Sequence, residues 1–165
     1  MEIRDIFDGV HIKFLIKDGK IIAYGWHYDE EKALIQLRKI MEYHNIDGEI
    51  RDNGKLRKWL FDEIEKVVME NKKIMLLKVE YKNKSVYQEL IKTNCGELTK
   101  YGELSKRAGI KYASMLVALL RNPLQVLIPC HRLITSKGEL MGFYPLGIEV
   151  KEKLIELEKR CRKVL

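Results

Sequence analysis

Two short runs of alternating apolar residues near the N-terminus constrain the fold more than any other feature. Residues 10–17 and residues 21–26 are rich in Ile and aromatic side chains, and Asp18 and Gly19 stand between them. An Asp-Gly pair supplies the positive φ angles that a two-residue turn between antiparallel strands requires. The sequence therefore predicts a β-hairpin, and with it an antiparallel sheet.

Helical patterns follow the hairpin. Asp29 is suited to cap a helix that runs to about residue 43, and a second helix is expected over residues 55–71. The side chains expected to face inward from the second helix are Leu56, Trp59, Leu60, Ile64 and Val67. Residues 74–81 are mostly apolar and predict a further strand. The first half of the chain is thus expected to be a small α/β lobe.

The second half is predicted to be mostly helical. Ser85 is suited to cap one helix, residues 101–108 and 111–121 predict two more, and a final helix is expected over residues 148–162. Gly109 separates the two middle helices. Two short helices joined by a glycine turn are a helix-turn-helix candidate.

The excess positive charge lies in the second half. The formal net charge is +7, with +8 in residues 82–165 and −1 in residues 1–81. A local excess of this kind favours a polyanionic partner, although a solvated, lysine-rich surface explains it equally well. We expect two domains with these bounds: an α/β N-terminal lobe, with a small antiparallel sheet and helices, joined to a mostly α C-terminal lobe with a winged helix-turn-helix.

The cysteines and apolar runs indicate the cellular setting. Cys95, Cys130 and Cys161 are odd in number and widely spaced, which argues against a disulfide framework and against a CxxC metal site. No apolar run is long enough to span a membrane, and the mixed, charged N-terminus does not indicate secretion. We therefore expect a reducing compartment, the cytoplasm, and no membrane partner.

A cysteine directly before a histidine is the most informative local pattern. The side chains of Cys130 and His131 would point to opposite faces of an extended backbone, so a bridging water is easier than direct contact. An imidazole near the thiol favours the nucleophilic thiolate. Glu158, on the inward edge of the last helix, is a candidate to orient the imidazole. On residue types alone, a buried structural cysteine, a capped loop histidine and a rim carboxylate remain open alternatives.

The full set of motifs resembles the O6-alkylguanine-DNA alkyltransferase family over roughly residues 84–160. The motifs that carry the resemblance are Asn122-Pro123, Pro129-Cys130-His131-Arg132, Tyr101-Gly102-Glu103-Leu104 with Gly109, Gly142-Phe143-Tyr144, and Leu154 with Glu158. The resemblance implies repair by a single, irreversible transfer of an alkyl group from O6 of guanine in DNA to the protein. It also implies a methyltransferase that needs no cofactor.

The roles of the site residues follow from the resemblance. Cys130 is expected to accept the alkyl group, His131 to act as its base through water, Glu158 to orient His131, and Asn122 to brace the turn before the thiol. Tyr101 is expected to contact the guanine edge or crowd the phosphate. The remaining residues expected to line the base pocket are Tyr144, Pro145 and Ile128.

The resemblance further implies that a monomer binds double-stranded DNA in the minor groove and flips the damaged base out of the stack, because O6 is otherwise inaccessible. The residues expected to contact DNA are Lys106, Arg107, Lys111, Tyr112, Ala113, Ser114, Arg121 and Arg132. Some relatives hold zinc in the N-terminal lobe through Cys and His. Because this half has no cysteine, no metal is expected.

Two departures from the family pattern keep rival functions open. Ala113 stands where the family has an arginine that fills the gap left by the flipped base, and Pro145 has no backbone N–H where the family has a donor to O6. The rivals are an alkyltransferase-like protein that binds lesions without efficient transfer, a thiol hydrolase, and a winged-helix transcription factor with a structural Cys130.

Overall fold

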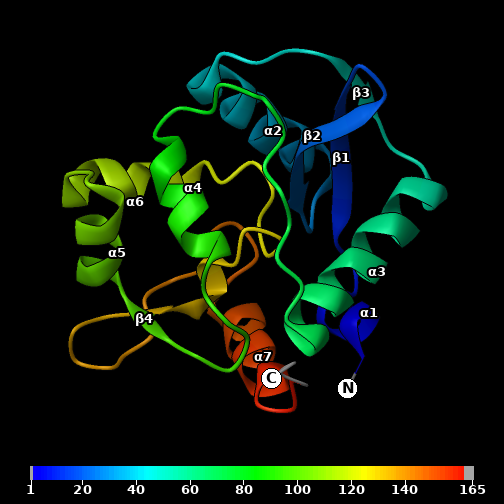
Figure 1. Ribbon diagram of the computed structural model, residues 1–165. Helices are drawn as coiled ribbons and strands as arrows, with labels where there is room; N and C mark the ends of the chain where they lie inside the picture. The colour runs from blue at the N-terminus through cyan, green and yellow to red at the C-terminus, as the bar shows by residue number, and fades with distance from the viewer. Residues whose placement is uncertain (1, 162–165) are drawn as a thin grey trace.

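The computed structural model describes residues 2–161 and contains an antiparallel sheet in the first half of the chain. Its strands are β1 (His11–Lys17), β2 (Lys20–His27) and β3 (Glu49–Arg51), in the order β2-β1-β3 (Figure 1). Asp18 and Gly19 form the two-residue turn, with φ angles of 52° and 73°. The predicted hairpin is therefore confirmed, because both turn residues adopt the positive φ that such a turn needs.

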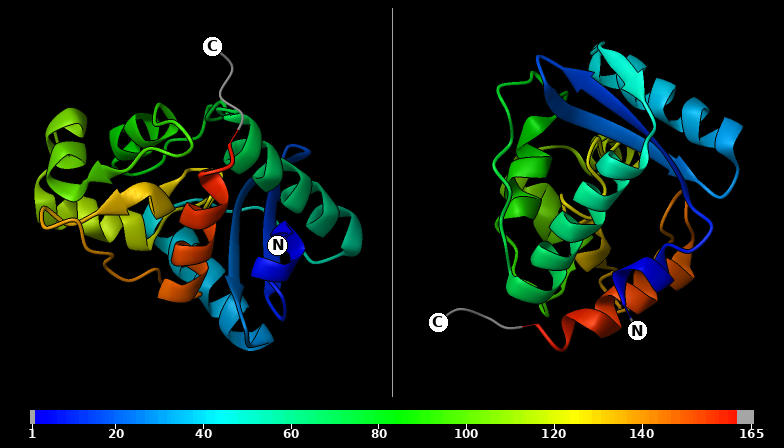
Figure 2. Two further views of the ribbon diagram at one scale, coloured as in Figure 1. Left: turned by 90° about the horizontal axis from the view of Figure 1, so that it is seen from below. Right: turned by 90° about the vertical axis from the view of Figure 1, so that its right-hand side faces the viewer.

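Helices cover both faces of this sheet. On one face lies α2 (Glu30–His44), whose cap residue Asp29 accepts a hydrogen bond from Lys32 N at 2.9 Å. At Gly25 of β2, a Cβ atom would lie 2.4 Å from Leu37 N, so only glycine allows α2 to approach this closely. The other face packs on the main core, which includes α1 (Ile3–Ile6) and α3 (Gly54–Glu70) (Figure 2).

Two expectations for the first half are wrong. Residues 74–81 form no strand, although Ile74, Leu76 and Val79 pack against the core. The segment is held to β2 by the Tyr81 hydroxyl, which donates to Ile22 O at 2.6 Å. A strand requires a partner along a sheet edge, which an alternating pattern cannot provide by itself. Trp59 is 39% exposed, because it lies on the outer side of α3.

The second half is mainly helical. It contains α4 (Lys84–Ile91), α5 (Tyr101–Ala108), α6 (Tyr112–Leu120) and α7 (Ile148–Glu158). The short strands β4 (Thr99–Lys100) and β5 (Leu133–Ile134) pair in parallel.

The helix ends test the expected boundaries. Gly109 ends α5 with a φ of 66°, so the predicted helix pair and its glycine turn are present. Ser85 is not the cap of α4, which begins one residue earlier, after Asn83. The last helix ends at Glu158, earlier than expected, and Arg162 lies outside the described residues.

A continuous hydrophobic core joins the two halves. It runs from Phe7 and Trp26 through Leu60 to Leu104 and Leu154. α1 lies against α7, as Figure 2 shows, although these helices come from opposite ends of the chain. The backbone of β2 also bonds directly to the loop before Cys130, since Tyr24 N donates to Pro123 O at 2.9 Å. The first half thus supports the loop that carries the candidate nucleophile.

The structure corrects the expectation that the cysteines do not pair. Cys95, before β4, forms a disulfide with Cys161, beyond the end of α7, with a Cα–Cα distance of 6.1 Å. The wide sequence spacing gave no hint of this pairing, because the fold brings the two segments together. Cys130 is the free cysteine of the chain. Among residues 2–161, no helix has the length and apolar character needed to cross a membrane.

Candidate active site

A tight turn places Cys130 at the edge of the core. Asn122 Oδ1 accepts from Leu124 N at 3.0 Å, and its Nδ2 donates to Ile128 O at 3.0 Å. The same Ile128 carbonyl accepts from Cys130 N at 2.8 Å. Val126 has a φ of 78°, a left-handed conformation that a β-branched residue rarely adopts. The structure therefore places Asn122 where it braces this turn from both sides.

The Cys130 thiol lies at an apolar pocket of about 490 Å³. The side chain is 7% exposed and begins a short 3₁₀ helix, η1 (Cys130–Arg132). The lining comes from α5, α6, β5 and the loop before α7, and includes Tyr101, Leu119, Leu133, Phe143, Tyr144 and Pro145. Ile128 does not line this pocket, contrary to expectation, because the turn directs its fully buried side chain into the core.

The surroundings of the thiol act on its ionisation in opposite directions. Burial raises the pKa of Cys130, whereas the Asn122 side chain, the Lys151 charge and the Gln125 side chain lower it. The first effect is the largest, so the pKa of the thiol lies above its usual value. Activation therefore requires a nearby base or further donors to the thiolate.

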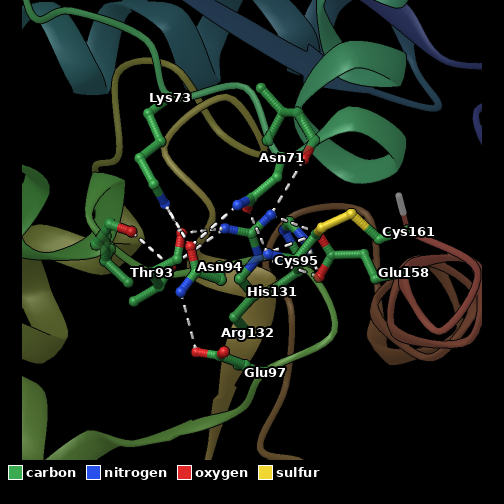
Figure 3. A network of polar contacts seen from close by, with 12 residues as sticks. Asn71, Lys73, Thr93, Asn94, Cys95, Glu97, His131, Arg132, Glu158 and Cys161 are labelled. Atoms are coloured by element: carbon green, nitrogen blue, oxygen red, sulfur yellow. Dashed lines mark hydrogen bonds and ion pairs between the residues drawn. A yellow bond between two sulfur atoms is a disulfide. The ribbon is translucent and has the colours of Figure 1, made fainter. Parts of the chain in front are cut away.

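His131 and Glu158 meet in the core behind the thiol. His131 Nε2 lies 3.1 Å from Glu158 Oε1, and both side chains are almost completely buried (Figure 3). The imidazole ring is not aligned for a direct hydrogen bond to this carboxylate. Among the described residues, neither ring nitrogen has a hydrogen bond of good geometry. Burial lowers the pKa of His131, and the Glu158 carboxylate partly opposes this. The pair that the sequence suggested is thus in contact distance.

Arg132 is a structural residue, so the expectation that it contacts DNA is wrong. Its side chain is 2% exposed and binds Glu158 through Nε at 3.0 Å and Nη2 at 2.6 Å. Nη1 donates to Thr93 O at 2.9 Å, and Nη2 also donates to Val67 O at 3.2 Å. These partners saturate the guanidinium inside the core, where phosphate cannot reach it (Figure 3). Glu158 therefore serves both His131 and Arg132.

Lys151 is a site residue that the sequence reasoning missed. It lies fully buried on α7, where Nζ donates to the Tyr101 hydroxyl at 2.9 Å and to Met141 O at 3.0 Å. Burial lowers the pKa of Lys151 from 10.5 to about 8. The signal was present in the sequence, because Lys151, Leu154 and Glu158 recur at the spacing of one helix face.

Gln125 is a second missed residue. Its Oε1 accepts from Trp26 Nε1 at 2.6 Å, and its Nε2 donates to Tyr144 O at 2.8 Å. Nε2 also lies 3.9 Å from Cys130 Sγ. No sequence signal could have identified this residue, since its partner Trp26 is distant in the chain and only the fold brings them together.

The other residues expected at a DNA surface lie around α5 and α6. The exposed ones are Lys106, Arg107, Lys111, Tyr112, Ala113 and Ser114, whereas Arg121 is half-buried. Arg107 Nη2 lies 3.7 Å from Glu103 Oε2 in a solvated pair, which leaves it available to phosphate. Val117 and Leu120 of α6 and Tyr144 beside the pocket are also exposed, so small and apolar side chains border the pocket mouth.

Comparisons with known proteins match the half of the chain that holds this site. Residues 82–160 match the family model of the 6-O-methylguanine DNA methyltransferase DNA-binding domain. Two methylated-DNA--protein-cysteine methyltransferases are similar to this chain, one from Metallosphaera sedula with 40% identity over 79 residues and one from Methanosarcina acetivorans with 42% over 80 residues. These matches cover 48% and 47% of this chain and 49% and 51% of the relatives. The match thus spans about half the length of these curated relatives.

A solved structure resembles the fold of nearly the whole chain. The O6-methylguanine-DNA methyltransferase of the hyperthermophilic archaeon Pyrococcus kodakaraensis aligns with a TM-score of 0.66 and 24% identity, over 90% of this chain and 91% of that one. At this identity the likeness shows the fold alone. The buried thiol and its partners thus lie within residues 82–160, the segment that is similar to the DNA-binding domain of 6-O-methylguanine DNA methyltransferase.

Proposed function

We propose that this protein repairs DNA by transferring an alkyl group, such as methyl, from O6 of guanine to Cys130, once per molecule. The Cys130 thiolate attacks the alkyl carbon, a carbon–sulfur bond forms, and the carbon–oxygen bond breaks. The bonding electrons remain with the guanine oxygen, and the guanine, which stays part of the DNA, takes up a proton. The observation that carries this proposal is the free thiol at an apolar pocket within the matched domain.

The buried residues behind the pocket supply the acid–base part of the proposal. His131 takes the thiol proton through a water molecule, and Glu158, at 3.1 Å, stabilises the imidazolium that forms. On the opposite side, the Tyr101 hydroxyl accepts from Lys151 and so has its own proton free to donate to the base. Neither step uses a cofactor or a metal ion.

The exposed face of α5 and α6 is the proposed DNA surface. A two-lobe chain with bounds at 1–81 and 82–165 would bind duplex DNA as a monomer, with α6 of a winged helix-turn-helix in the minor groove. The small residues Ala113 and Ser114 allow close approach, and Lys106 and Lys111 are free to reach phosphates. Base flipping then brings the O6 substituent to the thiol.

Stoichiometry tests the proposal. The protein is incubated with duplex DNA that contains O6-methylguanine, and intact mass and peptide maps are recorded. We expect one added methyl group, on Cys130, because a thioether is a poor leaving group and the disulfide leaves Cys95 and Cys161 without free thiols. Cys130→Ser should bind the same DNA without transfer. Repeated turnover, or binding without transfer by the wild-type protein, contradicts the proposal; the second result identifies a lesion-binding relative.

A further inference from the structure

Gln125 connects the N-terminal sheet to the thiol pocket. The residue is buried between β2 and the pocket, and two residues of β2, Tyr24 and Trp26, donate hydrogen bonds to it. Trp26 Nε1 donates to its amide oxygen at 2.6 Å, and the Tyr24 hydroxyl donates to its backbone carbonyl. The half of the chain outside the family match therefore fixes a residue inside the site.

The chemistry of its partners sets the orientation of the Gln125 amide. An indole N–H only donates, so the amide oxygen must face Trp26. The amide nitrogen then points to the other side, where Tyr144 O, which only accepts, lies at 2.8 Å. The reverse orientation would place donor against donor and acceptor against acceptor.

The same amide nitrogen faces the nucleophile. It carries two N–H groups, one directed to Tyr144 O and the other free for Cys130 Sγ at 3.9 Å. A hydrogen bond to an ionised acceptor is stronger than one to a neutral acceptor, so this contact favours thiolate over thiol. Burial raises the pKa of Cys130, and Gln125 is among the groups that oppose it.

We propose that Gln125 is a positioning residue of the site: Trp26 holds its amide, which fixes the pocket wall at the Tyr144 carbonyl and directs an N–H at Cys130 Sγ. The consequence for repair rests on the proposed transfer, whereas the effect on the thiol itself does not. The N-terminal sheet then takes part in tuning the nucleophile as well as supporting it. If Gln125 only filled space, methionine, which has a similar size and no donor, would replace it without effect.

Two measurements on Gln125→Met in the full chain test this role. The first is the pH dependence of Cys130 alkylation by iodoacetamide without DNA, followed by the mass of the Cys130 peptide. The second is the single-turnover rate of methyl transfer from O6-methylguanine duplex DNA, together with DNA affinity. We expect the midpoint of the pH profile to rise and the transfer rate at neutral pH to fall about tenfold, the usual effect of losing one hydrogen bond to a charged group, with DNA affinity within about twofold.

Trp26→Phe removes the distant anchor and leaves the pocket lining intact. It should shift the pH profile in the same direction by a smaller amount, because the amide becomes free to rotate. Trp59→Phe is the matched control, since Trp59 lies half-exposed on the outer side of α3, and it should behave as wild type. If Gln125→Met does not fold, Trp26→Phe decides through the same measurements.

The outcomes separate this inference from the proposed function. An iodoacetamide profile that coincides with wild type in the folded variants overturns the positioning role, whatever happens with DNA. A shifted profile in a protein that takes no methyl group from DNA supports the role of Gln125 and contradicts the proposed function.

Discussion

At the scale of single residues, burial gives each charged group near the pocket more than one partner. Glu158 binds Arg132 through short contacts and also lies beside His131. Burial raises the pKa of Glu158, but His131 and Arg132 together hold it below its usual value. A change at Glu158 therefore affects both the base and an internal ion pair.

Glu158→Gln should slow methyl transfer by about 10- to 1000-fold, as expected when a base loses its orienting group. It should also lower the free energy of unfolding by about 3 kcal/mol, because Arg132 stays buried without a counter-charge. His131→Gln leaves the Arg132–Glu158 pair in place, so it should slow transfer with a smaller loss of stability. Single-turnover rates and urea unfolding measure both effects. A Glu158→Gln variant with the wild-type rate and pH profile would show that Glu158 is only structural.

Lys151 should make stability depend on pH. Burial lowers its pKa from 10.5 to about 8, so between these values the unfolded chain binds the proton that the folded chain has lost. The free energy of unfolding contributed by this group should rise by about 2 kcal/mol between pH 7.5 and 9.5. The measurement is urea unfolding of the wild-type protein and of Lys151→Met at both pH values. The difference in free energy of unfolding between the two proteins removes the pH dependence that the tyrosines contribute to both. Parallel pH dependence in the two proteins contradicts a lowered pKa.

At the scale of elements, α6 combines a buried side with an exposed, small-residue side. Met115 and Ala118 pack into the core, whereas Ala113, Ser114 and Val117 are exposed. The first turn of this helix therefore carries no long side chain at position 113 to replace a flipped base. Tyr112, next to it and 46% exposed, is the large side chain nearest in sequence.

Ala113→Arg should speed methyl transfer from duplex DNA, because an arginine that fills the vacated position offsets part of the unstacking cost. Transfer from a free modified guanine base should be unchanged, since no stack is opened. Single-turnover rates on both substrates measure this difference. If the duplex rate does not change, the rate of Tyr112→Ala on duplex DNA shows whether Tyr112 already fills the position that the flipped base leaves.

At the scale of the whole molecule, elements from the beginning, the middle and the end of the described chain pack on one main core. The disulfide between Cys95 and Cys161 joins the segment before β4 to the end of α7, the helix that carries Lys151 and Glu158. Thr93, near the same segment, accepts from Arg132 (Figure 3). The disulfide therefore closes a loop of the chain that contains both members of the Arg132–Glu158 ion pair.

Cys161→Ser should lower the free energy of unfolding by about 4 kcal/mol, the chain-entropy value for a loop of 66 residues. Wild-type protein in a strong reductant should unfold like the variant, whereas the reductant should leave the variant itself unchanged. Thermal and urea unfolding with and without reductant provide the comparison. A wild-type midpoint that does not respond to the reductant would contradict a stabilising disulfide.

The sequence by itself determined the features that depend on neighbouring residues. Asp18 and Gly19 specify the hairpin through their φ angles, Asp29 starts α2 and Gly109 ends α5, because turns and caps are local. The motif around Cys130 likewise carries the resemblance to the alkyltransferase family, because its residues are adjacent in the chain.

Only the tertiary structure decided the features that depend on distant partners. The Cys95–Cys161 disulfide and the Trp26–Gln125 hydrogen bond each join segments that are far apart in sequence. The burial of Arg132 and the absence of a strand at residues 74–81 also depend on segments that are distant in the chain. Local spacing sets which side of an element a residue occupies, but the partner it meets depends on how the whole core packs. For this reason the nucleophile, Asn122, His131 and Glu158 could be predicted from the sequence, whereas the contacts of Arg132 and Gln125 could not.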